Sequence, residues 1–196
     1  MTSGGSDAGR PLLRREDLAR RATRVLEAGE GRDPVVLLVR DGDREIVVKD
    51  YAPRSFFVRE LVGRLMIRRE ARAYRALAGH PSVPRFFGRI DAHALAVEYR
   101  PGRRMSRKLA GAVPRDFLER LAGAIADMHA RGVAHLDLRH RTNVLVDEAG
   151  APVLIDFASA VCFRPGGLGA RLFLPLFAAV DRGALRKWQE RLATLR

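Results

Sequence analysis

The stretch His135-Leu136-Asp137-Leu138-Arg139-His140-Arg141-Thr142-Asn143 runs directly into the apolar segment Val144-Leu145-Val146, and it reads H-x-D-L-x-x-x-x-N-V-L-V. Asp156-Phe157 follows nineteen residues after Asp137, at the end of the apolar run Val153-Leu154-Ile155. Two acids and one amide therefore stand at turn positions beside short apolar runs. A rigid strand end can aim such side chains at a common point.

These residue types suit the transfer of a γ-phosphoryl group, which requires positioning and charge neutralisation more than covalent chemistry. Asp137 is the candidate base for an attacking hydroxyl. Magnesium prefers oxygen ligands, and Asn143 and Asp156 can supply them. ATP and Mg²⁺ are the cofactors that this pattern predicts.

A cation for the α- and β-phosphates is also required. Lys49 ends the β-branched run Ile46-Val47-Val48 in a chain that otherwise uses arginine almost everywhere, which favours a compact ammonium at this position. Glu70 follows twenty-one residues later, within a long predicted helix, and can orient Lys49 through an ion pair. An ordinary surface cluster with the neighbouring arginines is the alternative for Glu70.

Hydrophobic spacing predicts mixed β structure with one long helix in the first half of the chain. Asp41-Gly42-Asp43 favours a tight hairpin turn between two strands, and Gly79 is the expected end of the long helix. The expected helices are residues 14–28 and 55–78, and the expected strands are 35–40, 45–50, 85–91 and 94–100.

The second half is predicted to be mainly helical. Pro114 is expected to start a helix that ends at Ala130, and residues 144–146 and 153–155 are expected to be short strands. Asp181 is the expected cap of a last basic helix that contains Trp188. That helix is expected to pack on the rest of the chain, with an anionic membrane surface as the alternative. The apolar run Leu172–Val180 is expected to pack in the same cluster or to meet a lipid-like substrate.

The chain resembles the protein-kinase superfamily in the order of its motifs. These motifs are V-V-K at Lys49, the helix with Glu70, A-V-E-Y at residues 96–99, the H-L-D-L…N loop and V-L-I-D-F. The resemblance covers roughly residues 30–160 and is nearest to small bacterial RIO-like and lipopolysaccharide-kinase-like proteins. It implies an α+β, protein-kinase-like two-lobe fold, with a β-rich N-lobe (11–100) and a truncated helical C-lobe (101–196) after a flexible N-terminus (1–10).

The resemblance also implies a role for each matching residue. Asp137 would be the catalytic base, with Lys49 on the phosphates and Glu70 paired with it. Asn143 and Asp156 would hold magnesium. Glu98 and Tyr99 would form the hinge beside adenine, and His135 would support the catalytic loop.

Several positions depart from the usual kinase pattern. The chain has no G-x-G-x-x-G before the hairpin, only Gly29 and Gly31. Asn143 stands six residues after Asp137, one more than usual, so the loop must bulge. Leu136 replaces the loop arginine and Ala158 replaces the glycine of D-F-G, so we expect no switch by activation-loop phosphorylation.

The formal net charge of +13 would attract polyanions, but the basic residues form no single block. One cysteine, Cys162, excludes an internal disulfide and fits a reducing compartment. No apolar run approaches the ~20 residues of a membrane span. We expect a monomer in the cytoplasm, with peripheral contact at the inner membrane surface as an option.

The acceptor remains open at this stage. A protein serine or threonine is favoured, and a lipopolysaccharide-core or other sugar hydroxyl is the alternative. A catalytically weak pseudokinase scaffold would explain the missing glycine motif and Ala158. A nucleic-acid-binding domain is supported by charge alone, because no reader motif is present.

Overall fold

A computed structural model describes residues 13–106, 113–140 and 142–193. The N-terminus at 1–10 lies outside them. The chain divides into two compact units, Met1–Arg64 with Phe87–Val97 (unit 1) and Leu65–Phe86 with Glu98–Arg196 (unit 2). A β-rich N-terminal part followed by helices confirms the predicted α+β class.

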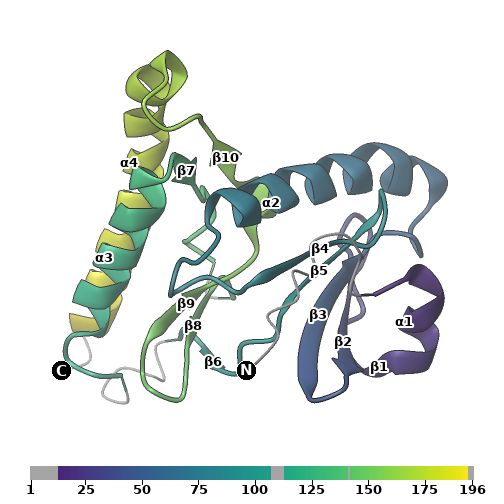
Figure 1. Ribbon diagram of the computed structural model, residues 1–196. Coiled ribbons are helices and arrows are strands. Elements are labelled where there is room, and N and C mark those ends of the chain that lie inside the picture. The colour runs from purple at the N-terminus through teal and green to yellow at the C-terminus, as the bar shows by residue number, and fades with distance from the viewer. Residues whose placement is uncertain (1–12, 107–112, 141, 194–196) are drawn as a thin grey trace, which may run out of the picture. The chain divides into compact units, whose positions relative to one another are not determined.

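Unit 1 is built on a five-stranded sheet, seen in Figure 1, whose strand order is β1-β2-β3-β5-β4. Its strands are β1 (Ala22–Glu27), β2 (Val35–Asp41), β3 (Arg44–Asp50), β4 (Phe86–Arg89) and β5 (Ala94–Glu98). The predicted hairpin is confirmed: β2 and β3 pair antiparallel in full register, with Val36 opposite Lys49, and Gly42 adopts a φ of 61° in the turn. This pairing fixes Lys49 on a central strand of the sheet.

The helix predicted at 14–28 is wrong in its second half. Helix α1 (Arg15–Arg21) ends early, and the chain continues as β1, which pairs antiparallel with β2 through two irregularities. Thr23 and Val25 are β-branched residues at alternating positions, which suits a strand. Pairing with β2 supplies backbone hydrogen bonds that stabilise the strand more than the weak helical periodicity of these residues favours a helix.

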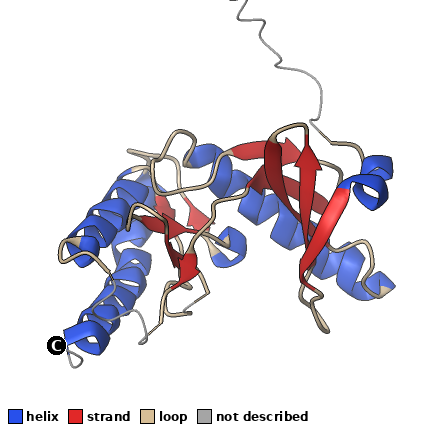
Figure 2. Cartoon of the chain, turned by 90° about the horizontal axis from the view of Figure 1, so that it is seen from below, coloured by secondary structure: helices blue, strands red, loops and turns tan. Residues whose placement is uncertain are grey.

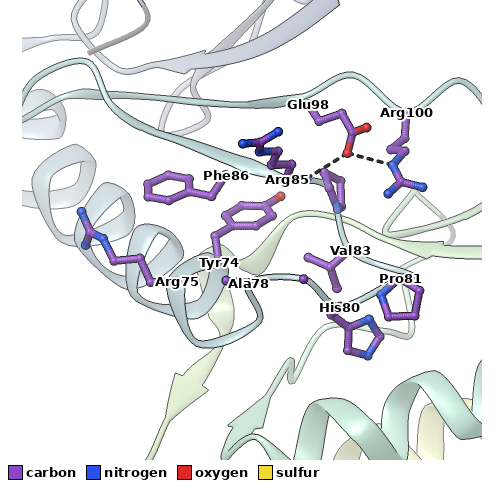
Figure 3. A pocket seen from close by; sticks show the side chains of 12 residues that line it. Tyr74, Arg75, Ala78, His80, Pro81, Val83, Arg85, Phe86, Glu98 and Arg100 are labelled. Carbon is purple, nitrogen blue, oxygen red and sulfur yellow. Dashed lines mark hydrogen bonds and ion pairs between the residues drawn. The ribbon is translucent and has the colours of Figure 1, made fainter. Parts of the chain in front are cut away.

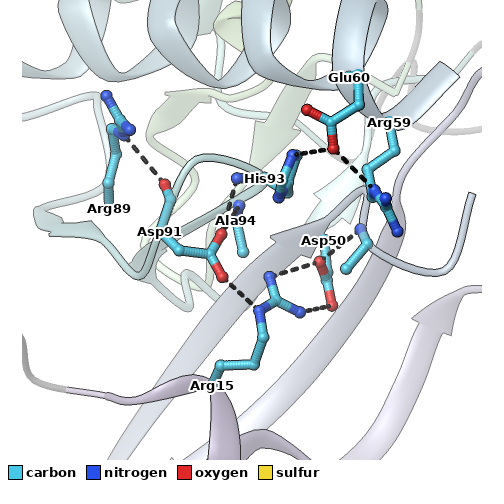
Figure 4. Close-up of polar contacts among 9 residues, drawn as sticks. Arg15, Asp50, Arg59, Glu60, Arg89, Asp91, His93 and Ala94 are labelled. Carbon is cyan, nitrogen blue, oxygen red and sulfur yellow. Dashed lines mark hydrogen bonds and ion pairs between the residues drawn. The ribbon is translucent and has the colours of Figure 1, made fainter. Parts of the chain in front are cut away.

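Arg15 fastens α1 to the sheet (Figure 4). Its guanidinium donates to both carboxylate oxygens of Asp50, at 2.9 and 3.0 Å, and also to the carboxylate of Asp91. The hydrogen bond with Asp91 is the largest cause that raises the pKa of Arg15. Burial would raise the pKa of Asp91, but the hydrogen bonds from Arg15 and from the backbone of His93 and Ala94 lower it below the ordinary value. One acid at the end of β3 and one in the β4–β5 turn thus share one cation.

The long helix predicted at 55–78 is confirmed, with a π-helical first part. Residues Val58–Gly63 (η1) are π-helical, and α2 continues from Arg64 to Ala76. The chain leaves α2 at Gly79, whose φ of 73° is cheap for glycine, as the predicted C-cap requires.

Unit 2 contains the helices α3 (Phe117–Ala130) and α4 (Leu168–Ala193), which pack side by side in Figures 1 and 2. α3 begins three residues after the expected Pro114. Short strands form two small ladders, β6 (Arg103–Arg104) with β8 (Val144–Val146) and β9 (Pro152–Leu154), and β7 (Val133–Ala134) with β10 (Val161–Cys162). A 3₁₀ turn, η3 (Phe157–Ser159), follows β9.

The prediction that Asp181 caps the last helix is wrong. α4 starts at Leu168, so Asp181 lies in its middle, where it is fully buried. Trp188 is also buried, which confirms that this part of the helix packs on unit 2 and excludes Trp188 from a membrane-facing role. No helix among residues 13–106, 113–140 and 142–193 is both long and apolar enough to cross a bilayer.

Candidate active site

The loop between β7 and β8 brings Asp137 and Asn143 into direct contact. The Asn143 amide Nδ2 donates to the Asp137 backbone carbonyl at 3.0 Å and to Asp137 Oδ2 at 2.9 Å. His140 Nδ1 donates to the other carboxylate oxygen, Oδ1, at 2.6 Å. Asn143 is buried, whereas the Asp137 side chain is partly exposed, so the carboxylate is held in place and still reaches solvent.

The additional residue of this loop is absorbed by two successive turns. The His140 N–H donates to the Asp137 carbonyl, and the Asn143 N–H donates to the His140 carbonyl. The predicted bulge therefore keeps Asn143 against Asp137. Arg141, within this bulge, lies outside the described residues.

Leu136 adopts a φ of 68°, a left-handed conformation that is strained for a residue with a branched side chain. Asp181 from the middle of α4 compensates for this strain. Its Oδ1 accepts from the Leu136 N–H, and its Oδ2 accepts from the His135 N–H, both at 2.8 Å. His129 Nε2 donates to the same Oδ2 at 2.9 Å. One buried carboxylate thus fixes the backbone immediately before Asp137.

His135 links the loop to the segment between β9 and Asp156. Its Nε2 lies 3.0 Å from the Ile155 carbonyl, which can only accept, so the proton resides on Nε2. The ring is fully buried, and this burial lowers the pKa of His135. His135 is therefore neutral near pH 7 and acts as a fixed donor.

Asp156 also has a left-handed backbone, with φ 64° and ψ 73°, and its carboxylate accepts from the Ala158 N–H at 3.5 Å. The preceding Ile155 N–H donates to the Asn143 carbonyl at 3.0 Å, which places the two predicted magnesium ligands on hydrogen-bonded neighbouring segments. Carboxylate and amide oxygens are ligands that suit Mg²⁺, and two protein ligands leave room for phosphate oxygens and water.

Four rings connect helix α2 with this loop. Tyr74 stacks on Phe86 with ring centroids 5.9 Å apart and meets Phe157 edge-on at 5.1 Å, and Phe157 in turn contacts His135 at 4.6 Å. Arg69 of α2 donates to the Ser159 carbonyl at 2.8 Å. The segment after Asp156 is therefore anchored to α2 by aromatic packing and by a hydrogen bond.

The structure places Lys49, the residue predicted to contact phosphate, and Glu70, its predicted ion-pair partner, in different units. Lys49 is half-buried on β3 in unit 1, and Glu70 is only 2% exposed on α2 in unit 2. Burial at this level does not fit an ordinary surface charge cluster, because a carboxylate is rarely buried without a specific role. The pairing of Glu70 with Lys49 stays a prediction.

Gly29 and Gly31 lie in the β1–β2 loop and adopt φ values of 63° and 55°. A Cβ at Gly29 would stand 2.2 Å from the Pro34 carbonyl oxygen, so only glycine fits there. Arg54 donates to the carbonyl of Ala28 at 2.6 Å and braces the loop. The helix predicted over 14–28 does not reveal this hairpin, because residues Ala22–Glu27 form its first strand, β1.

Glu98 ends β5, and Tyr99 follows it. The Glu98 carboxylate accepts from the Arg85 N–H at 3.0 Å and from Arg100 Nε at 2.9 Å. It lines a pocket of about 610 Å³ together with Tyr74, Phe86 and Arg75, all within unit 2 (Figure 3). The Glu98 side chain and the Glu98 N–H, which donates to the Arg85 carbonyl at 2.8 Å, are thus both engaged in structural contacts. The role of Glu98 and Tyr99 beside adenine stays a prediction.

The sheet of unit 1, which carries Lys49, and the loop of unit 2, in which Asp137 contacts Asn143, fit the class of kinase-like phosphotransferases. The chain belongs to the APH phosphotransferase enzyme family, whose model matches residues 24–149. The predicted membership in the protein-kinase-like superfamily is confirmed, and the protein is a phosphotransferase. The matched region contains Lys49, Glu70, Glu98, Tyr99, Asp137 and Asn143 and ends before Asp156. No curated protein matched the chain.

Sequence reasoning missed two residues of the site. Asp181, predicted as a helix cap, is the only acid between residues 157 and 189 and directly follows the apolar run Leu172–Val180, which is a signal for a buried role. His140 carries no signal in the sequence for its 2.6 Å contact with Asp137, which arises from the turn between the two residues.

Proposed function

We propose that the protein is an ATP- and Mg²⁺-dependent kinase that transfers the γ-phosphoryl group to a hydroxyl. The observation that carries the proposal is the fixed Asp137 carboxylate, held by Asn143 Nδ2 and His140 Nδ1 but still open to solvent. Asp137 would orient the acceptor hydroxyl and take its proton.

Asn143 and Asp156 would hold the magnesium ion. When bound, the ion neutralises charge on the phosphate oxygens. Asn143 suits this role because its Nδ2 is committed to Asp137, which directs the amide oxygen away from that contact. Asp156 is supported by the Ile155–Asn143 hydrogen bond next to it.

Lys49 would contact the α- and β-phosphates, and Glu70 would orient it. The glycine loop at residues 28–34 would cover the phosphates, because it leads into the β2–β3 hairpin that carries Lys49. The backbone of Glu98 and Tyr99 would lie beside adenine. Residues 11–100 and 101–196 would act as N-lobe and C-lobe.

The acceptor we favour is a protein serine or threonine hydroxyl, with a sugar hydroxyl of a lipopolysaccharide core as the alternative. The geometry of Asp137 does not distinguish a protein hydroxyl from a sugar hydroxyl as the acceptor. The proposed setting is the cytoplasm, and the proposed working form is a monomer. Arg69 and the β7–β10 ladder hold the short segment after Asp156, which supports activity without phosphorylation of that segment.

The decisive test is transfer from γ-labelled ATP with Mg²⁺, using protein acceptors and lipopolysaccharide-core acceptors in parallel. We expect Asp137→Ala to lower the rate by about 10²–10⁴-fold. Asp43→Asn, an exposed acid in the β2–β3 turn, is the matched control and should keep full activity.

Turnover that is unchanged in Asp137→Ala would refute the proposed base. Binding of ATP without turnover on any acceptor, and without autophosphorylation, would instead identify a pseudokinase scaffold. That alternative is favoured by Ala158, which stands where kinases usually have glycine.

A further inference from the structure

The first half of helix α4 carries an exposed apolar stripe. Leu168, Leu172, Leu176 and Val180 recur every four residues, which places them along one side of the helix. The three leucines are 76%, 70% and 67% exposed, and Phe173 beside them is 53% exposed. Contiguous exposed side chains of this size mark an interaction surface.

The helix cannot turn this stripe inward. Its opposite side is committed to unit 2, where Ala170, Ala178 and Ala184 are buried. On that side Asp181 holds the catalytic loop, and Trp188 Nε1 donates to the Leu138 carbonyl at 3.0 Å. The rotational setting of α4 is therefore fixed by the loop that it supports, and the stripe stays at the surface.

The exposed charged residues between positions 157 and 189 are all positive, and the first exposed acid after them on α4 is Glu190. Arg171 and Arg182 are exposed on the same helix, Arg164 precedes it, and Arg186 and Lys187 follow. Asp181, the one acid between residues 157 and 189, is buried, and its carboxylate accepts hydrogen bonds from three donors. The exposed surface of this segment thus combines apolar side chains with cations and presents no acid.

We propose that this face of α4 docks on an anionic phospholipid bilayer. Apolar side chains flanked by arginines match the acyl and headgroup layers of such a surface. A second copy of the chain is a poorer occupant, because a two-fold contact would bring the same cations together. Docking requires no turnover and stands independently of the kinase proposal.

The test is sedimentation of the full chain with vesicles of phosphatidylcholine alone and of an equimolar mixture with phosphatidylglycerol. We expect binding to the mixed vesicles only, weakened by added salt. Leu172→Ser with Leu176→Ser should lower partitioning roughly tenfold or more. Both side chains are exposed, so thermal unfolding should be unchanged. Asp137→Ala should bind as the wild type does.

Leu61→Ser with Leu65→Ser is the matched control, since these two leucines are also four residues apart on a helix and exposed. This control pair should leave vesicle binding intact. The proposal is overturned if the wild type ignores the mixed vesicles or if both leucine pairs weaken binding equally. It is also overturned if the chain is a dimer that Leu172→Ser with Leu176→Ser disperses, because a second copy would then occupy the face.

Discussion

At the scale of single residues, the loop that carries Asp137 depends on one side chain from a helix far along the chain. Asp181 accepts from the backbone of His135 and Leu136 and so maintains the strained φ of 68° next to Asp137. Left-handed backbone of this kind persists only where the surroundings hold it. Asp181 is accordingly a positioning residue for Asp137.

We predict that Asp181→Asn lowers kcat roughly 100-fold, because an amide cannot satisfy all three donors and Asp137 loses its placement. The KM for ATP should change far less, since Asp181 bonds to His129, His135 and Leu136, none of which is proposed to contact the nucleotide. Adding Leu136→Gly to Asp181→Asn should restore part of kcat, because glycine adopts positive φ without strain. Equal effects on kcat and KM, with no rescue by Leu136→Gly, would reduce Asp181 to a folding role.

At the scale of elements, replacing glycine by alanine should change the stability of the fold in opposite directions at two helical positions. A Cβ at Gly63, in the π-helical η1, would stand 2.7 Å from Tyr51 Cβ, whereas a Cβ at Gly123, on the exposed face of α3, meets nothing within 4 Å. We predict that Gly63→Ala destabilises the protein by about 1–3 kcal/mol through overpacking. Gly123→Ala should stabilise it by about 0.5–1 kcal/mol through backbone entropy. Urea unfolding measures both, and a shift of the same sign in the two variants would contradict this reasoning.

Elements were predictable where short-range chemistry decides them. Asp41-Gly42-Asp43 specified the β2–β3 hairpin, and Gly79 specified the end of α2. The strand β1 was missed because its stability comes from pairing with β2 and not from its own periodicity. The site residues on short motifs, Asp137, Asn143 and Asp156, could be named from spacing. Asp181 could not, because its role arises from packing α4 against a loop more than forty residues earlier.

At the scale of the whole molecule, acid should destabilise the fold through two buried histidines as well as through excess positive charge. Burial lowers the pKa of both His80 and His135 below the ordinary value of 6.5. Above that value both histidines are neutral in the folded and unfolded chain. As the pH falls through 6.5 the unfolded chain binds protons that the folded chain does not, so the free energy of unfolding falls. Each histidine contributes a slope of at most about 1.4 kcal/mol per pH unit.

We therefore predict lower stability at pH 5.5 than at pH 7.5, followed through the fluorescence of Trp188, the single tryptophan. Added NaCl separates the two causes, because it screens repulsion within a chain of net charge +13 but does not reach desolvated rings. The loss at pH 5.5 should thus persist in high salt and shrink in a His80→Gln, His135→Gln double variant, although that variant is less stable at pH 7.5. A pH dependence that salt abolishes, or that the double variant retains in full, would assign the acid sensitivity to surface charge instead.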